Sequence, residues 1–273
     1  MNLDTDKHLP ISKDLQDELY KDVLKPSAQS LGEILSFLPR TIRLFLSGWE
    51  KWLINGEETL KVTAAAIKEK VSQIPADKIV EPEPYVVVPA IQQLCYCQDN
   101  EFIRDLYANL IVSSMNADKK WDVHPAFVDI IKQITPDEAK ILGQLGNFKN
   151  NFQPLLDVRA YDNDKMEGGH QLIITNFTTV GFDVVEKKDN ICSYIDNLLR
   201  LNLIEIPPTY HLTDETLYTP LETSPVLKDM LAHFSFFSSF NFSHKLFVIS
   251  NLGLLFIKIC CPSPYNASQN AKV

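Results

Sequence analysis

The first half of the chain carries hydrophobic residues at the spacing of α-helices. Between residues 31 and 52 they recur at alternating steps of four and three, the rhythm of a heptad repeat, which places them on one stripe of a helix. The stripe consists of Leu31, Leu35, Leu38, Ile42, Phe45, Trp49 and Trp52. Because Pro39 falls within this stripe and lacks a backbone donor, we expect a kink there or two successive helices.

Helical spacing continues on both sides of this stripe. Helices are predicted over residues 14–29, 57–72, 89–97, 99–115 and 124–133. Pro82 and Pro84 predict an extended lead-in before the third of these, because the residue before a proline avoids the α region. Residues 1–134 are therefore expected to form an α-helical domain, organised as a bundle.

The pattern changes after residue 134. Thr135 is a suitable helix cap, Pro136 suits the first helical position, and Glu138 completes a capping box. Strands are then predicted at 171–177, 203–206 and 245–249, and helices at 189–201, 225–233 and 252–261. The run that contains Asp157 and Arg159 is expected to be a loop.

The order of a helix, a short strand, a long connection and a second strand resembles a winged-helix module. In this interpretation residues 189–201 form the recognition helix, and residues 203–249 form a long wing. The predicted fold class is thus mainly α with an α+β part. It comprises an α-helical domain at 1–134, a winged-helix-like domain at 135–262 and a polar tail at 263–273.

Composition and charge narrow the functional classes. The 273 residues are 45% hydrophobic and carry a net charge of −9, which indicates a folded protein and argues against a protein that coats nucleic acid as a whole. The five cysteines follow neither a disulfide framework nor zinc-ligand spacing. The N-terminal residues lack an apolar signal-peptide core. We therefore expect free thiols and a cytoplasmic protein.

Sequence motifs indicate no catalytic, cofactor-binding or metal-binding residues. The chain contains no H-E-x-x-H, no phosphate-binding glycine loop and no G-x-S-x-G, and its six histidines are scattered. A hydrolase with an unrecognised site remains a third functional class.

The predicted helix 189–201 carries a first set of candidate contact residues, for a protein partner or for nucleic acid. They are Lys187, Lys188, Asn190, Ser193, Asn197 and Arg200, side chains that reach phosphates or base edges in winged-helix proteins. Glu186, Asp189 and Asp196 lie in the same segment and would repel a phosphate backbone. Protein contact is therefore favoured, with DNA binding as the alternative.

Residues 31–53 offer a second candidate surface, for self-association or for peripheral contact with the inner membrane. Its residues are Arg40, Arg43, Phe45, Trp49 and Trp52. The charged residues interrupt any stretch long enough to span a bilayer, so packing in a bundle or an oligomer is favoured over membrane contact. Both tryptophans are equally consistent with an ordinary intramolecular core.

Several segments together resemble a known family. They are Asp22 to Pro26, Glu81 to Tyr85, Leu106 to Leu110 and His124 to Ile131. The chain resembles, from about Leu19 to about Cys261, the Abi-alpha (abortive infection alpha) family of bacterial phage-defence proteins. The resemblance implies a non-enzymatic cytoplasmic component of anti-phage defence that acts through protein contacts. It implies no cofactor and no small-molecule ligand, and it transfers no catalytic residue.

Overall fold

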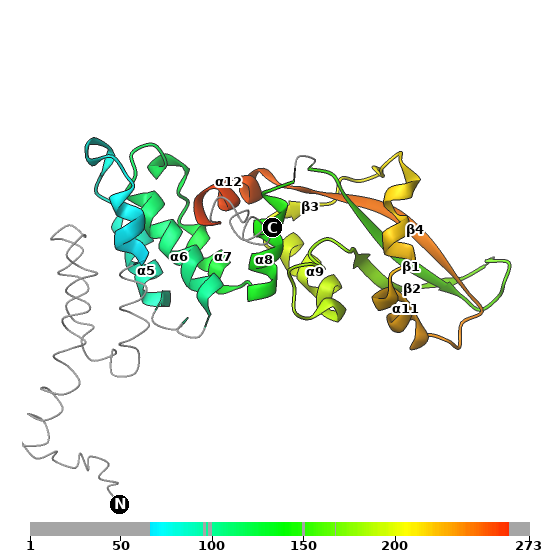
Figure 1. Cartoon of the computed structure of the whole chain (residues 1–273). Helices are drawn as coiled ribbons and strands as arrows, with labels where there is room; N and C mark the ends of the chain where they lie inside the picture. The colour runs from blue at the N-terminus through cyan, green and yellow to red at the C-terminus, as the bar shows by residue number, and fades with distance from the viewer. Residues whose placement is uncertain (1–65, 95–96, 98–99, 149–150, 167, 262–273) are drawn as a thin grey trace, which may run out of the picture.

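The computed structural model describes residues 66–94, 97, 100–148, 151–166 and 168–261 (Figure 1). The described part is elongated, with helices at one end, a β-sheet at the other, and α8, α9 and α12 between them (Figure 1). The predicted helix at 14–29, the heptad stripe at 31–52 and the polar tail at 263–273 lie outside these residues.

Every regular element that the structure describes before residue 148 is helical. Helical residues 66–72 are followed by the 3-10 helix η3 (Ala76–Lys78), α5 (Pro84–Leu94), α6 (Glu101–Ser114), the 3-10 helix η4 (Lys120–Asp122), α7 (Ala126–Lys132) and α8 (Pro136–Leu145). These helices bury large side chains against one another, including Tyr107, Leu110, Phe127 and Ile141. Burial of such side chains is the main favourable term in folding.

Two of the predicted helix starts lie in this region and can be compared with the starts of α8 and α5. The capping box of α8 is confirmed, because Thr135 Oγ1 accepts from the Glu138 amide at 3.3 Å and the Glu138 carboxylate accepts from the Thr135 amide. The extended lead-in is wrong at Pro84, which is the first residue of α5. Proline is well tolerated there because its missing N–H has no partner in a first turn. Pro89, the predicted start, lies inside α5.

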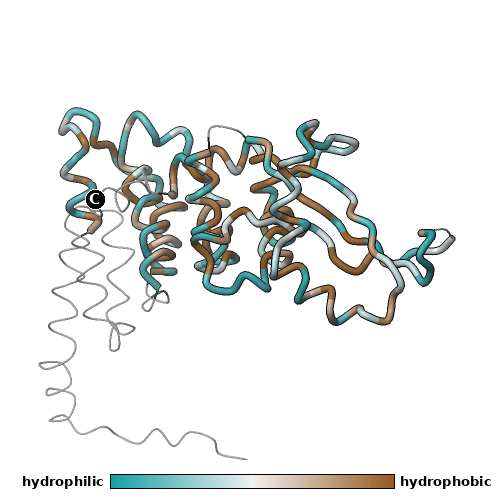
Figure 2. The backbone as a smooth tube through the Cα atoms, turned by 45° about the vertical axis from the view of Figure 1, so that its right-hand side comes forward, coloured by the Kyte–Doolittle hydropathy of each residue, from teal (hydrophilic) through white to brown (hydrophobic). Residues whose placement is uncertain are grey.

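The sheet contains four antiparallel strands in the order β2-β1-β4-β3. They are β1 (Gln153–Tyr161), β2 (His170–Phe177), β3 (Ile204–Glu205) and β4 (Ser239–Ile249). The loop that joins β1 and β2 is hydrophilic and lies at the far end of the molecule (Figure 2). The mixed α and β class of the fold is therefore as predicted.

Strand β1 corrects the expectation of a loop around Asp157. Leu156, Val158 and Ala160 are buried at the alternation of a strand, and Leu155 is buried as well. Asp157 is acceptable in an interior strand because it lies 2.8 Å from the Lys245 ammonium on β4. Asp157, a polar residue that indicated a loop, thus forms an ion pair within the sheet.

The remaining elements connect the strands and end the described chain. They are the 3-10 helix η5 (Lys188–Asn190), α9 (Ile191–Arg200), the 3-10 helix η6 (Glu215–Leu217), α10 (Thr219–Glu222), α11 (Pro225–Ala232) and α12 (Asn251–Cys260). Ser250 caps α12 by accepting from the Gly253 amide at 2.9 Å. Residues 206–238 therefore form the long connection between β3 and β4.

Helix α12 returns to the helical end and packs against α6. Asn109 Nδ2 donates to the Cys260 carbonyl at 2.9 Å, and Ser113 Oγ donates to the Ile259 carbonyl at 3.1 Å. The buried hydrophobic residues form one core cluster that includes both Ile67 and Cys261. The division at residue 134 stays a prediction, and α12 links the two proposed parts.

Candidate functional site

The first set of candidate contact residues lies on helix α9 and on the turn before it, and the buried face of α9 sets its orientation. Ile191, Tyr194, Ile195 and Leu198 are buried, at the spacing of one helical face. The opposite face, which includes Ser193, is exposed to solvent. The amphipathic pattern of this segment therefore decides which side chains are available to a partner.

The start of α9 is held by a single buried carboxylate on α8. Asp137 accepts hydrogen bonds from the backbone amides of Glu186 and Lys187, from the Tyr194 hydroxyl and from the Lys140 ammonium. Burial opposes the charge of Asp137, but these hydrogen bonds together outweigh it and lower the pKa of the carboxyl. The ionised side chain therefore connects α8 to the segment that enters α9.

The end of α9 is held by Gln133, the residue that follows α7. Asn197 Nδ2 donates to the Gln133 carbonyl at 2.9 Å, and Arg200 donates to Gln133 Oε1 at 3.0 Å. Arg200 also donates to Asn197 Oδ1 at 2.7 Å through its other terminal nitrogen. The candidate residues Asn197 and Arg200 thus make hydrogen bonds that hold the end of α9 to the residue after α7.

The other four candidate residues, Lys187, Lys188, Asn190 and Ser193, are exposed. They lie among three exposed carboxylates, Glu186, Asp189 and Asp196. Lys188 lies over the Phe182 ring, 5.5 Å from its centroid. The exposed side of α9 and the turn before it, which we call the α9 surface, is therefore mixed in charge.

The second set of candidate residues lies outside the described part of the chain. All five precede residue 66, the first residue that the structure describes; they are Arg40, Arg43, Phe45, Trp49 and Trp52. Within residues 66–261 as described, no helix is both long and apolar enough to cross a membrane. Self-association or membrane contact through residues 31–53 stays a prediction.

Two titratable side chains of the described part, His244 and Cys192, are held in contacts or burial within the chain. His244 lies between two glutamates, 2.8 Å from Glu215 and 2.6 Å from Glu222, and stacks on the Tyr218 ring at 4.0 Å. Burial raises the pKa of Cys192 to about 12, so this thiol is protonated at neutral pH. Among the described residues, no group of three or more side chains is placed to hold a metal ion.

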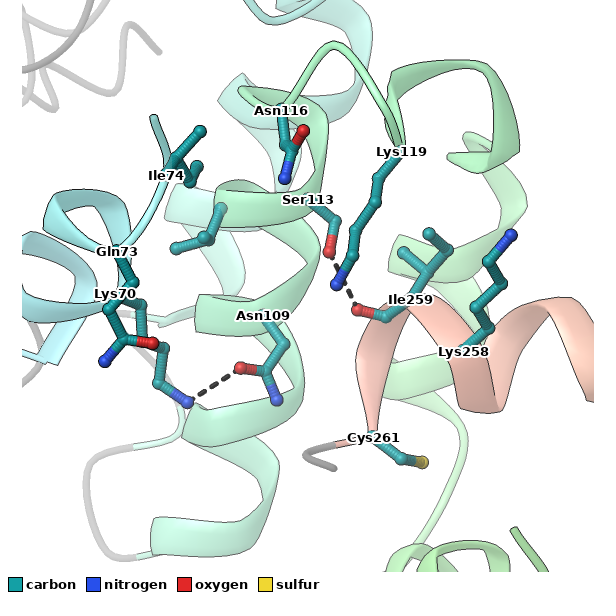
Figure 3. A pocket seen from close by; sticks show the side chains of 11 residues that line it. Lys70, Gln73, Ile74, Asn109, Ser113, Asn116, Lys119, Lys258, Ile259 and Cys261 are labelled. Carbon is teal, nitrogen blue, oxygen red and sulfur yellow. Dashed lines mark hydrogen bonds between the residues drawn. The ribbon is translucent and has the colours of Figure 1, made fainter. Parts of the chain in front are cut away.

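The structure also assembles a pocket that the sequence did not indicate (Figure 3). It lies beside α6 and α12, and its volume is about 510 Å³. We call it the lysine pocket, after Lys70, Lys119 and Lys258 in its walls. Lys70 belongs to the helical residues 66–72, Lys119 to the loop after α6, and Lys258 to α12. No local sequence motif therefore contains all three.

Comparisons with known proteins place the chain in a family. The family model described as abortive infection alpha matches residues 55–260, and the chain belongs to this family. The predicted resemblance is therefore confirmed, and membership indicates a role in abortive infection, a form of phage defence. No curated protein matches the chain.

One similar solved structure is that of an uncharacterized protein from the hydrocarbon-degrading marine bacterium Alcanivorax borkumensis SK2. It is 17% identical, and the match covers 49% of this chain and 90% of that chain with a TM-score of 0.32. A likeness at this level supports no argument about fold or function.

Proposed function

We propose that the protein is a non-enzymatic, cytoplasmic component of phage defence that acts through protein contacts at the α9 surface. The observation that carries this proposal is the charge pattern of that surface. Lys187, Lys188 and Arg200 are matched in number by Glu186, Asp189 and Asp196, whereas binding to a phosphate backbone needs clustered positive charge. A surface of mixed charge with exposed polar side chains suits the rim of a protein interface.

We further propose that the second half of the chain works as a winged-helix-like module. Helix α9 is followed directly by β3, and β3 pairs antiparallel with β4. Within the wing proposed at 203–249, the connection at 206–238 is attached to β4, because the Tyr218 hydroxyl donates to the Lys245 carbonyl at 2.8 Å. Modules of this type serve either as DNA readers or as protein-interaction domains.

DNA binding is the competing function, because Lys187 and Lys188 are exposed next to the start of α9. Titration of the purified protein with duplex DNA at low and moderate salt separates the two functions. We expect no salt-sensitive binding. A DNA-binding regulator would bind more weakly as salt increases, and the double variant K187E/K188E would abolish that binding.

Arg200 is unsuitable for this test because its replacement would also remove the contacts with Gln133. Hydrolysis of nucleic acid or nucleotide by the purified protein would contradict both binding functions. Self-association and membrane contact through residues 31–53 are tested separately, by light scattering and by flotation with liposomes.

A further inference from the structure

The walls of the lysine pocket carry positive charge without a carboxylate. Its eleven lining residues are Lys70, Gln73, Ile74, Asn109, Val112, Ser113, Asn116, Lys119, Lys258, Ile259 and Cys261. Burial raises the pKa of the Cys261 thiol to about 12, so this side chain is neutral at physiological pH. In a chain with a net charge of −9, a pocket with three lysines and no acidic lining residue is a local exception.

One side of the pocket is fixed by hydrogen bonds within the protein. Asn109 uses both ends of its amide, because Oδ1 accepts from the Lys70 ammonium at 2.7 Å and Nδ2 donates to the Cys260 carbonyl. Ser113 Oγ donates to the Ile259 carbonyl (Figure 3). Both side chains therefore hold α6, α12 and Lys70 in position rather than offering donors to a ligand.

Other donors in the pocket are not used within the described residues. Asn116 Oδ1 accepts from the Asp118 amide at 2.9 Å, which leaves Asn116 Nδ2 available. The Gln73 amide and the Lys119 ammonium make no side-chain hydrogen bond or ion pair to any other residue that the structure describes. Lys119 extends toward Ser113 and Ile259 (Figure 3).

The three lysines differ in how far they are neutralised. Lys70 lies 3.7 Å from Asp105, and Lys258 lies 2.6 Å from Asp122. Both carboxylates stand outside the pocket lining. Lys119 has no carboxylate partner among the described residues. Its positive charge in the pocket is therefore not balanced by an ion pair there.

We propose that the lysine pocket binds a small phosphate-bearing molecule, with the phosphate held by Lys119, Asn116 and Gln73. A lysine ammonium binds phosphate as a point charge, and the neighbouring amides add donors from other directions. The volume of about 510 Å³ is in the range of small-molecule sites. This inference is independent of the function of the α9 surface, which is formed by other residues.

Calorimetric titration of the full chain with ADP, inorganic phosphate and adenosine tests the proposal. ADP and phosphate are expected to bind, and adenosine is expected to give no signal. The variant K119Q should weaken ADP binding roughly tenfold, the loss expected for one charge-assisted hydrogen bond. K132Q is the matched control, because Lys132 is also an exposed lysine and lies on α7 outside the pocket lining. It should bind ADP like the wild type.

Sedimentation with vesicles that contain phosphatidic acid distinguishes a lipid phosphate from a soluble one. Vesicle binding that K119Q weakens, without binding of ADP or phosphate, would identify a lipid headgroup as the source of the phosphate. Equal affinities of wild type and K119Q in every arm, or no binding in any arm, would overturn the proposal. Equal thermal melting curves for wild type and K119Q establish that the variant is folded.

Discussion

The Tyr194 hydroxyl donates a hydrogen bond of 3.0 Å to the Asp137 carboxylate, and this contact joins the first turn of α8 to the first turns of α9. Asp137 also accepts from the amides of Glu186 and Lys187, which belong to the segment that enters α9. The orientation of α9 is thus set by a buried carboxylate, and the exposed α9 surface is what remains for a partner.

Replacement of Asp137 by alanine should lower the free energy of unfolding by about 3 kcal/mol, because several buried donors lose their acceptor at once. Urea denaturation measures this change. D183A is the control, since Asp183 is exposed and makes no side-chain hydrogen bond or ion pair to the other described residues. It should change stability by less than about 0.5 kcal/mol. Equal effects of the two variants would show that the Asp137 network does not stabilise the fold.

The lowered pKa of Asp137 predicts a specific pH dependence. A carboxyl whose pKa is lower in the folded than in the unfolded state contributes stability at pH values above the unfolded value, about 3.9. As the pH falls below about 4, the unfolded chain takes up the proton first, and the contribution is lost. The difference in stability between wild type and D137N should therefore shrink below about pH 4. A difference that grows with acidification would contradict the assigned direction.

Two glycines within helices should respond to alanine with opposite signs. A Cβ atom at Gly253 in α12 would lie 1.9 Å from the backbone carbonyl oxygen of Leu203, so G253A should destabilise the protein by about 3 kcal/mol. A Cβ atom at Gly143 in α8 would meet nothing within 4 Å, so G143A should stabilise it by up to about 1 kcal/mol. Thermal melting compares the two. A stabilised G253A would mean that α12 and β3 are farther apart than described.

Local signals in the sequence were sufficient to predict where α8 and α12 begin. Thr135 and Ser250 cap their helices through side-chain contacts with residues three positions later, and such contacts depend only on neighbours in the chain. Strand β1 was missed because its stability depends on distant residues. The partner of Asp157 is Lys245, and no pattern around residue 157 reveals that pair.

The lysine pocket was also not predicted, because its lining residues are distant from one another in the sequence. Lys70 and Lys258 are far apart in the sequence, and they share a pocket because α12 packs against α6. The exposed face of α9 was easier to predict, since the spacing of hydrophobic residues along one helix defines it. The hydrogen bonds of Asn197 and Arg200 were not predictable, because their partner Gln133 follows α7 and is distant in the sequence.

Plating of a panel of phages on cells that produce the protein tests the central claim most directly, with Ser193 as the position to change. Ser193 is exposed on α9, and its side chain makes no hydrogen bond to the other described residues, so S193R should preserve the fold while it places a large cation on the α9 surface. Added positive charge strengthens contact with DNA and disrupts a fitted protein interface.

We predict that the wild type lowers the plating efficiency of at least one phage and that S193R loses this protection. S235R, which introduces the same residue at an exposed serine after α11, should keep the protection. Full protection by S193R would contradict a function that depends on protein contacts at the α9 surface.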